Sequence, residues 1–235
     1  RYLKEEQYIP GPVVDRANRT RWQADGALTL PARAQGLISG LMSTASPNAW
    51  LDQFVVPSTY RQLNPEVTFA AIAADLGAVD VLVYNAGSGM FGNVSDIDAA
   101  ALEQAWQINT RGLLVAAQQV LPAMKRRGCG NIVVVGATAS LRGGENFAAF
   151  ASAKAAQRSL AQSMARHLGP QGVHVSLLIV DGVIDIPRTR KMFPERPHEL
   201  FLNPDDIAAT ALFLTRQPRN AWTFEVDLRP SAENW

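Results

Sequence analysis

Residues 79–87 read Val79-Asp80-Val81-Leu82-Val83-Tyr84-Asn85-Ala86-Gly87, an apolar run that stops at a small polar turn. Such a run is typical of a strand that is buried on both faces, as strands of parallel sheets are. A helical pattern follows at about 99–127, and residues 131–135 form a second apolar run that is nearly all β-branched. Because strands and helices alternate, the sequence predicts a parallel sheet with helices on both faces.

The alternation continues toward the end of the chain. We predict a helix at about 147–168, a strand at 173–180, a short helix opened by Pro204 and a last strand at 222–228. Upstream, residues 27–30 and 53–56 read as strands and 65–76 as a helix, whereas 3–24 are polar without clean periodicity. The sequence therefore predicts one α/β domain over residues 1–235, in which residues 1–25 match the pattern poorly.

Composition argues against several classes of protein. The 235 residues carry 22 basic and 21 acidic side chains, and this balance indicates neither nucleic acid nor a membrane surface as a partner. The chain has no apolar run long enough to span a bilayer and no signal-peptide core, so we expect a cytoplasmic protein. The three histidines lack metal-ligand spacing and Cys129 is the single cysteine, so we expect neither a metal site nor a disulfide.

Short motifs stand where predicted strands end or inside predicted helices. They are Asn85-Ala86-Gly87 after the first strand, Asn109 and Lys154 in the two long helices, and Gly182, Ile184 and Pro187 after the third strand. In this order and spacing the chain resembles the short-chain dehydrogenase/reductase family from about residue 55 to 230. The resemblance implies a single-domain Rossmann-like, doubly wound sheet, NADP or NAD as cofactor, a small carbonyl or alcohol substrate, and a homodimer or homotetramer.

The resemblance also implies roles for the matching residues. Lys154 would hold the ribose hydroxyls of the nicotinamide nucleotide, and Asn109 would order that lysine through water. Asn85, Ala86 and Gly87 would line the cofactor, and Gly182 and Ile184 belong to the loop that would close over the nicotinamide.

Asn109 and Lys154 each have a structural alternative. Asn109 lies on an apolar helix stripe that comprises Leu102, Trp106, Leu113, Ala116, Val120 and Met124. A buried amide must find hydrogen-bond partners, so Asn109 can instead bridge helix and strand in the core, and the two roles can coexist. For Lys154 the alternative is an ammonium that reaches solvent from the edge of its helix.

Both hydroxyl groups of the family's usual chemistry are absent. Phe150 stands where the resemblance puts a proton-transferring tyrosine, and Ala137 stands where it puts a serine that orients the substrate. Thr138 and Ser140 could supply a displaced hydroxyl at the end of a strand, or they could only cap or turn the chain. Two functions stay open: an oxidoreductase with a non-standard acid and base, and a catalytically inactive binding or oligomerisation protein.

The expected nucleotide-binding turn is eroded. It should fall near residues 9–15, where Gly11 alone keeps a glycine position. Arg33 follows the second predicted strand and suits the 2′-phosphate of NADP, with a solvated arginine as the alternative. Ser58 stands near the usual adenine-contacting position, and we expect Trp235 in an interface or crevice.

Overall fold

The computed structural model describes residues 69–70, 72–74, 77–87 and 89–232 of the chain. Of the helix predicted at 65–76, residues 69, 70 and 72–74 are helical. The strands predicted at 27–30 and 53–56 lie outside the described residues, as do the candidates Gly11, Arg33, Ser58 and Trp235.

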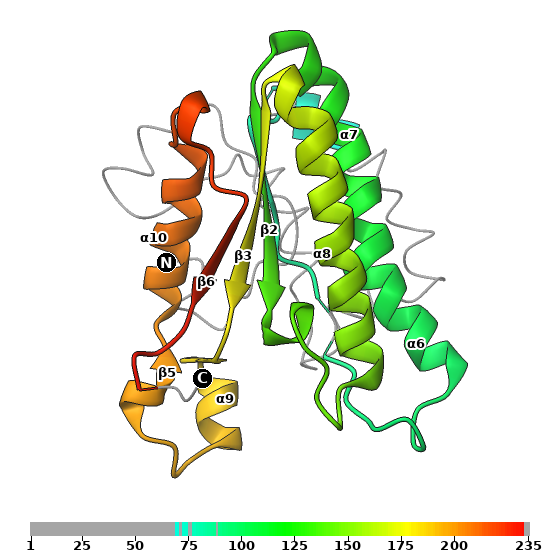
Figure 1. Cartoon of the computed structure of the whole chain (residues 1–235), viewed down its shortest axis with the longest axis vertical. Coiled ribbons are helices and arrows are strands. Elements are labelled where there is room, and N and C mark those ends of the chain that lie inside the picture. The colour runs from blue at the N-terminus through cyan, green and yellow to red at the C-terminus, as the bar shows by residue number, and fades with distance from the viewer. Residues whose placement is uncertain (1–68, 71, 75–76, 88, 233–235) are drawn as a thin grey trace.

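Four parallel strands form the main sheet of the described part of the chain (Figure 1). In spatial order they are β1 (Val81–Tyr84), β2 (Gly130–Ala137), β3 (Val173–Val180) and β6 (Glu225–Leu228). β2 and β3 pair over their whole length, from Gly130 opposite Val173 to Ala137 opposite Val180. Every residue of β3 is buried, as the sequence predicts for a strand covered on both faces.

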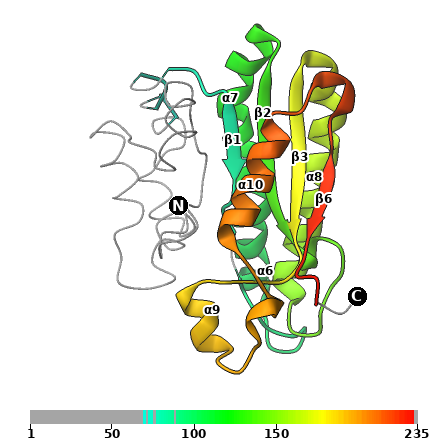
Figure 2. The same cartoon turned by 90° about the vertical axis from the view of Figure 1, so that its left-hand side faces the viewer.

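Helices cover both faces of this sheet, as Figures 1 and 2 show. On one face lie α6 (Ala99–Trp106), α7 (Gly112–Arg127) and α8 (Ala148–Leu168), and on the other lies α10 (Pro204–Thr215). α8 and α10 contact β2 and β3 from opposite sides. The α/β fold predicted from the sequence is confirmed.

Successive residues of β2 and β3 alternate between two hydrophobic cores. Ile132 and Leu177 pack with residues of α7 and α8, whereas Val133 and Leu178 pack with residues of α10. Side chains of a strand point alternately to its two faces, so an unbroken apolar run supplies both cores at once.

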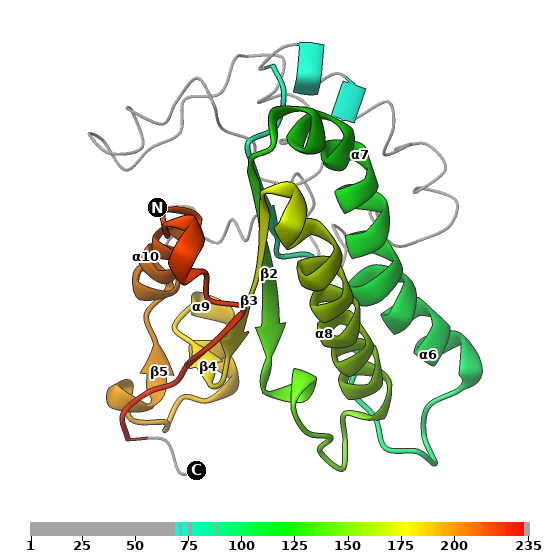
Figure 3. The ribbon, with the colours of Figure 1, turned by 45° about the horizontal axis from the view of Figure 1, so that its top comes forward.

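The chain between β3 and α10 forms a small unit at the carboxyl end of the sheet (Figure 3), and Leu202 of this unit packs into the core that β3 shares with α10. It contains β4 (Val183–Ile184), α9 (Pro187–Met192) and β5 (Phe201–Leu202), and β4 pairs with β5 in parallel. Short 3₁₀ turns complete the described part: Thr138–Ser140, Gly169–Gln171, His198–Leu200 and Arg219–Ala221.

The last strand is shorter than the predicted 222–228, because β6 begins only at Glu225. Trp222 instead stacks its ring on His174, with ring centroids 4.8 Å apart and an angle of 7° between the planes. Trp222 therefore packs against β3 from the position directly after the 3₁₀ turn Arg219–Ala221.

Candidate active site

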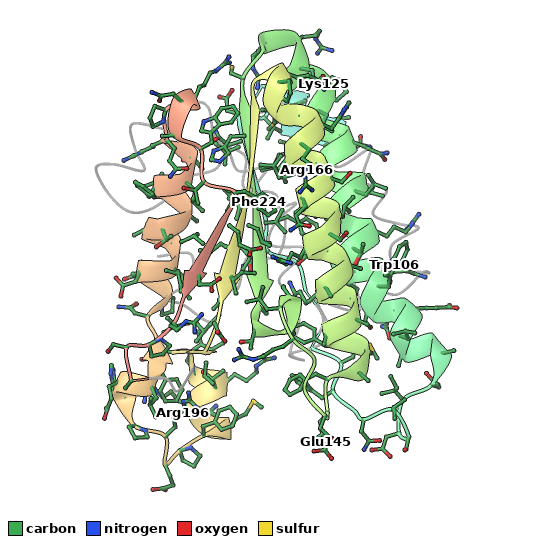
Figure 4. The ribbon with its side chains drawn as sticks, viewed as in Figure 1. Trp106, Lys125, Glu145, Arg166, Arg196 and Phe224 are labelled. Carbon is green, nitrogen blue, oxygen red and sulfur yellow. The ribbon has the colours of Figure 1, made fainter. Side chains whose placement is uncertain are left out.

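A π-helical turn, Gln107–Arg111, interrupts the helix predicted at 99–127 and separates α6 from α7. One additional residue in a turn shifts the face of the preceding helix by about 100°. The predicted apolar stripe is therefore wrong at its first two positions, where Leu102 is 43% and Trp106 46% exposed. Figure 4 shows Trp106 on the side of the helix that faces away from the sheet. Ala105 and Ile108 are buried in their place.

Side chains from other elements bond to two carbonyl groups of the π turn. The hydroxyl of Tyr84, at the end of β1, donates to the carbonyl of Ile108. Gln157 of α8 donates from Nε2 to the carbonyl of Asn109 at 2.7 Å. Gly112 leaves room for the Tyr84 hydroxyl, which a Cβ at position 112 would overlap. π turns of this kind occur frequently at functional sites.

Lys154 is buried, with 5% of its surface exposed. Its Nζ atom donates to the carbonyl of Val135 on β2 at 2.9 Å and to Oε1 of Gln157 at 3.0 Å. The alternative of a lysine that reaches solvent is therefore wrong. Burial lowers the pKa of the ammonium from 10.5 to about 7, because the charged form loses its hydration.

Gly87 lies against both Asn109 and Lys154 at the carboxyl end of β1. A Cβ at position 87 would lie 3.3 Å from Oδ1 of Asn109 and 3.6 Å from Nζ of Lys154. Glycine therefore keeps the approach to both side chains open, and Asn85 and Ala86 lead into it directly from the strand. The structure thus brings these predicted residues together at the carboxyl end of parallel strands, where open α/β sheets bind ligands.

The two candidate hydroxyls, Thr138 and Ser140, lie in the 3₁₀ turn after β2. Ser140 is buried, and its Oγ accepts a hydrogen bond from the N–H of Ala137 at 3.1 Å. This contact favours the capping role for Ser140. Thr138 is half-buried and donates its hydroxyl hydrogen to Asp181, the residue that follows β3.

Gln157 and Asp181 are polar residues of this region that the sequence analysis missed. Asp181 is 4% exposed, and its carboxylate lies 3.4 Å from Arg229 and 3.8 Å from Arg142. An acidic residue directly after a buried strand is a signal that could have identified Asp181. A carboxamide one turn after Lys154, among alanines, is the corresponding signal for Gln157.

Phe150 belongs to a cluster of three aromatic rings at the start of α8. Its ring centroid lies 6.3 Å from that of Phe91 and 6.4 Å from that of Phe147, which are 5.2 Å apart and perpendicular to each other. A β-bridge between Gly92 and Phe147 ties the loop after β1 to the start of α8. Phe91 is 61% and Phe147 38% exposed, so an apolar surface stands one turn before Lys154.

The predicted loop residues after β3 have structural contacts. A Cβ at Gly182 would lie 2.9 Å from Cδ of Pro230, so this close packing requires glycine. Ile184 pairs with Leu202 across β4 and β5, and Pro187 is the first residue of α9. These contacts position the segment beside the sheet and do not involve Lys154 or Asn109.

A cavity of about 320 Å³ opens on the small unit formed by β4, α9 and β5. Its lining comprises Asp185, His198, Phe201, Asn203 and Pro204. Arg190 donates two hydrogen bonds to Asp185, at 2.6 and 2.8 Å, which hold the pKa of that carboxyl below its usual value. None of the site residues predicted from the sequence lines this cavity.

Two further properties concern the described residues alone. Over the ranges that the structure covers, His, Cys, Asp and Glu side chains form no group of three or more that could hold a metal ion. Within the same ranges, every helix is too short or too polar to cross a bilayer.

Comparison with known proteins identifies the family. Residues 59–196 match the family described as short chain dehydrogenase. A D-xylose 1-dehydrogenase of Caulobacter vibrioides is 30% identical over 171 residues, which is 68% of either chain. The crystal structure of a short-chain dehydrogenase from Rhodopseudomonas palustris is 32% identical with a TM-score of 0.59, covering 72% of this chain and 70% of that one.

A metagenomic short-chain oxidoreductase, whose crystal structure is in complex with NADP, is 25% identical with a TM-score of 0.59. That match covers 72% of this chain and 69% of the other. The family match covers more than half of the residues and agrees with the observed parallel sheet. The chain therefore belongs to the short-chain dehydrogenase/reductase family of oxidoreductases.

Proposed function

We propose that the protein transfers hydride between NADP and a small carbonyl or alcohol substrate, with an acid and base other than serine and tyrosine. The observation that carries this proposal is the convergence of Gly87, Asn109 and the buried Lys154 at the carboxyl end of β1. Burying a charged ammonium costs free energy, so packing of the core alone does not explain a lysine at position 154.

The residues present fit the nicotinamide half of such a cofactor. An ammonium has three hydrogens, and Lys154 uses two of them for Val135 and Gln157, so a third can serve a ribose hydroxyl. Asn85, Ala86 and Gly87 would line the nucleotide beside it. When bound, the nicotinamide supplies the hydride chemistry, and the protein supplies binding, orientation and electrostatics.

Two observations favour NADP over NAD. Arg33 follows a predicted strand at the position that suits a 2′-phosphate. The metagenomic relative was crystallised with NADP. Relative affinities for NADPH and NADH test this choice directly, and tighter binding of NADH would contradict it.

Lys154 is also the group that we assign to proton exchange, either directly or through a water molecule that it holds. With a pKa of about 7 it can release and take up a proton near neutral pH, as an acid–base catalyst must. Thr138, held by the carboxylate of Asp181, is the second candidate for a hydroxyl that contacts the substrate.

Fluorescence titration with NADPH tests the proposal. We expect saturable binding by the wild type. Lys154→Ala should weaken it by a factor of roughly 10 to 100, because hydrogen bonds from a charged donor contribute about 1.5–3 kcal/mol. Absence of binding to NADPH and NADH at millimolar concentration would overturn the proposal.

The second candidate function is a catalytically inactive binding or oligomerisation protein. It is favoured by the side chains of Ala137 and Phe150, which carry no hydroxyl, and by the capping contact of Ser140. The double change Ala137→Ser with Phe150→Tyr restores both missing groups. Carbonyl reductase activity gained by that variant would show a working cofactor site and would count against this candidate.

A further inference from the structure

The Gln157 side chain links Lys154 to Asn109 inside the protein. Gln157 is fully buried, and its Oε1 accepts from the Lys154 ammonium at 3.0 Å. Its Nε2 donates to the main-chain carbonyl of Asn109 at 2.7 Å. An ammonium can only donate and a carbonyl can only accept, so the two neighbours fix which way the carboxamide faces.

Both ends of this link are held by other elements. The carbonyl of Asn109 belongs to the π turn, and Thr110 of the same turn donates to the carbonyl of Ala153 on α8 at 2.9 Å. At the other end, the Lys154 ammonium also donates to Val135 on β2. The resemblance implies that Asn109 orders the lysine through water, and the carboxamide of Gln157 adds a direct connection between the two residues.

We propose that Gln157 is a positioning residue that fixes the Lys154 ammonium beside Gly87 by accepting one of its three hydrogens. A catalytic role for the ammonium at this position rests on the proposed function. The effect of Gln157 on the ammonium can be tested without any cofactor. Gln157 touches neither substrate nor cofactor in this assignment and acts through Lys154.

The two groups to which the ammonium donates in the described part of the chain are uncharged: the carbonyl of Val135 from β2 and the carboxamide of Gln157 from α8. The carboxamide of Asn109, also uncharged, lies against Gly87 as the ammonium does. Burial is the cause of the shift toward the neutral amine, and ionic neighbours play no part in it. The effect of a substitution at Gln157 on the pKa of Lys154 should therefore not be masked by nearby charges.

Two substitutions at Gln157 should move the pKa of Lys154 in opposite directions. Gln157→Leu removes an acceptor that favours the charged form, so the pKa should fall below that of the wild type. Gln157→Glu places a carboxylate beside the ammonium, so the pKa should rise by about 1 to 3 pH units. The glutamate keeps the oxygen that Lys154 contacts, so it tests the proposal even if the leucine variant does not fold.

The titration can be followed by NMR of ¹³C-labelled lysine. The chain contains four lysines, Lys4, Lys125, Lys154 and Lys191, and the signal that disappears in Lys154→Arg identifies the buried one. Gln162→Glu is the matched control, because it adds the same charge at a half-buried position of the same helix. We expect it to leave the Lys154 titration unchanged.

Opposite shifts for the two Gln157 variants and none for the control would support the proposal. Unchanged titration in Gln157→Glu, or shifts of the same sign in both variants, would overturn it. NADPH binding is measured separately, so the two ideas can fail separately. If the titration of Lys154 shifts in the Gln157 variants but NADPH does not bind, only the proposed function is contradicted. If NADPH binds but the titration of Lys154 does not shift, only the role of Gln157 is contradicted.

Discussion

Lys154 holds an ammonium between β2 and α8, where two uncharged acceptors replace its hydration shell. Such burial opposes folding, because the charged form is far better solvated in water than in the interior. Groups whose pKa is strongly shifted by burial concentrate at functional sites. The burial of Lys154 at the candidate site therefore lowers the stability of the folded protein.

Lys154→Met should remove a dependence of stability on pH. The pKa of Lys154 is about 7 in the folded protein and 10.5 in the unfolded chain, so between these values the unfolded chain binds more protons. The stability of the wild type should therefore rise with pH over this window, by up to roughly 5 kcal/mol, and the cost of the buried charge is fully present below it. Urea unfolding at several pH values between about 6 and 10 measures the difference.

The methionine variant should gain most stability relative to the wild type near pH 6, and this gain should shrink toward pH 10. Lys125→Met is the matched control, since Lys125 lies exposed at the end of α7 (Figure 4). An equal pH slope in the wild type and in Lys154→Met would show that the ammonium does not titrate as described.

At the scale of elements, the helices and strands follow the sequence closely, whereas the π turn does not. β3 lies at the predicted 173–180, and the helical region predicted at 99–127 begins and ends there. The π turn depends on Tyr84 and Gln157, which are 24 and 48 residues away from the carbonyl groups that they bond. Local periodicity contains no information on such distant partners, so the sequence predicts an uninterrupted helix.

Tyr84→Phe should destabilise the fold by about 1–3 kcal/mol, because it leaves the buried carbonyl of Ile108 without that donor. Gly112→Ala should also destabilise it, because the new methyl group overlaps the Tyr84 hydroxyl. The two effects should not add, since Tyr84→Phe removes the atom that the methyl group meets. Urea unfolding of both single variants and the double variant measures this coupling, and strictly additive effects would contradict the described contact.

At the scale of the whole molecule, the position of the site follows from the topology. Residues after β1 and residues of α8 can be expected to meet because the carboxyl ends of parallel strands lie at one edge of the sheet. This reasoning locates Asn85, Gly87 and Lys154 from the sequence. It cannot predict the contact of Gln157 with Lys154 or that of Thr138 with Asp181, because these contacts depend on the depth and rotation of packed side chains.

α8 also connects the site to the far edge of the described sheet. Arg158, next to Gln157, donates two hydrogen bonds to Glu225 of β6, at 2.6 and 2.9 Å. Both side chains are partly exposed, so Arg158→Met should cost only about 1 kcal/mol, and less at high salt. Urea unfolding at low and high salt checks this, and a cost that does not change with salt would indicate lost packing rather than lost charge pairing.

The cluster of Phe91, Phe147 and Phe150 has a consequence for selectivity. A ligand that lies against these rings would be held by dispersion forces and by shape complementarity. The three side chains have no group that could form a directed hydrogen bond with it. Apolar surfaces distinguish ligands by size, at about 1–3 kcal/mol per methylene, and they reject an added hydroxyl group only weakly. A ligand bound against this surface would therefore be selected by its size and shape more than by the direction of a hydrogen bond.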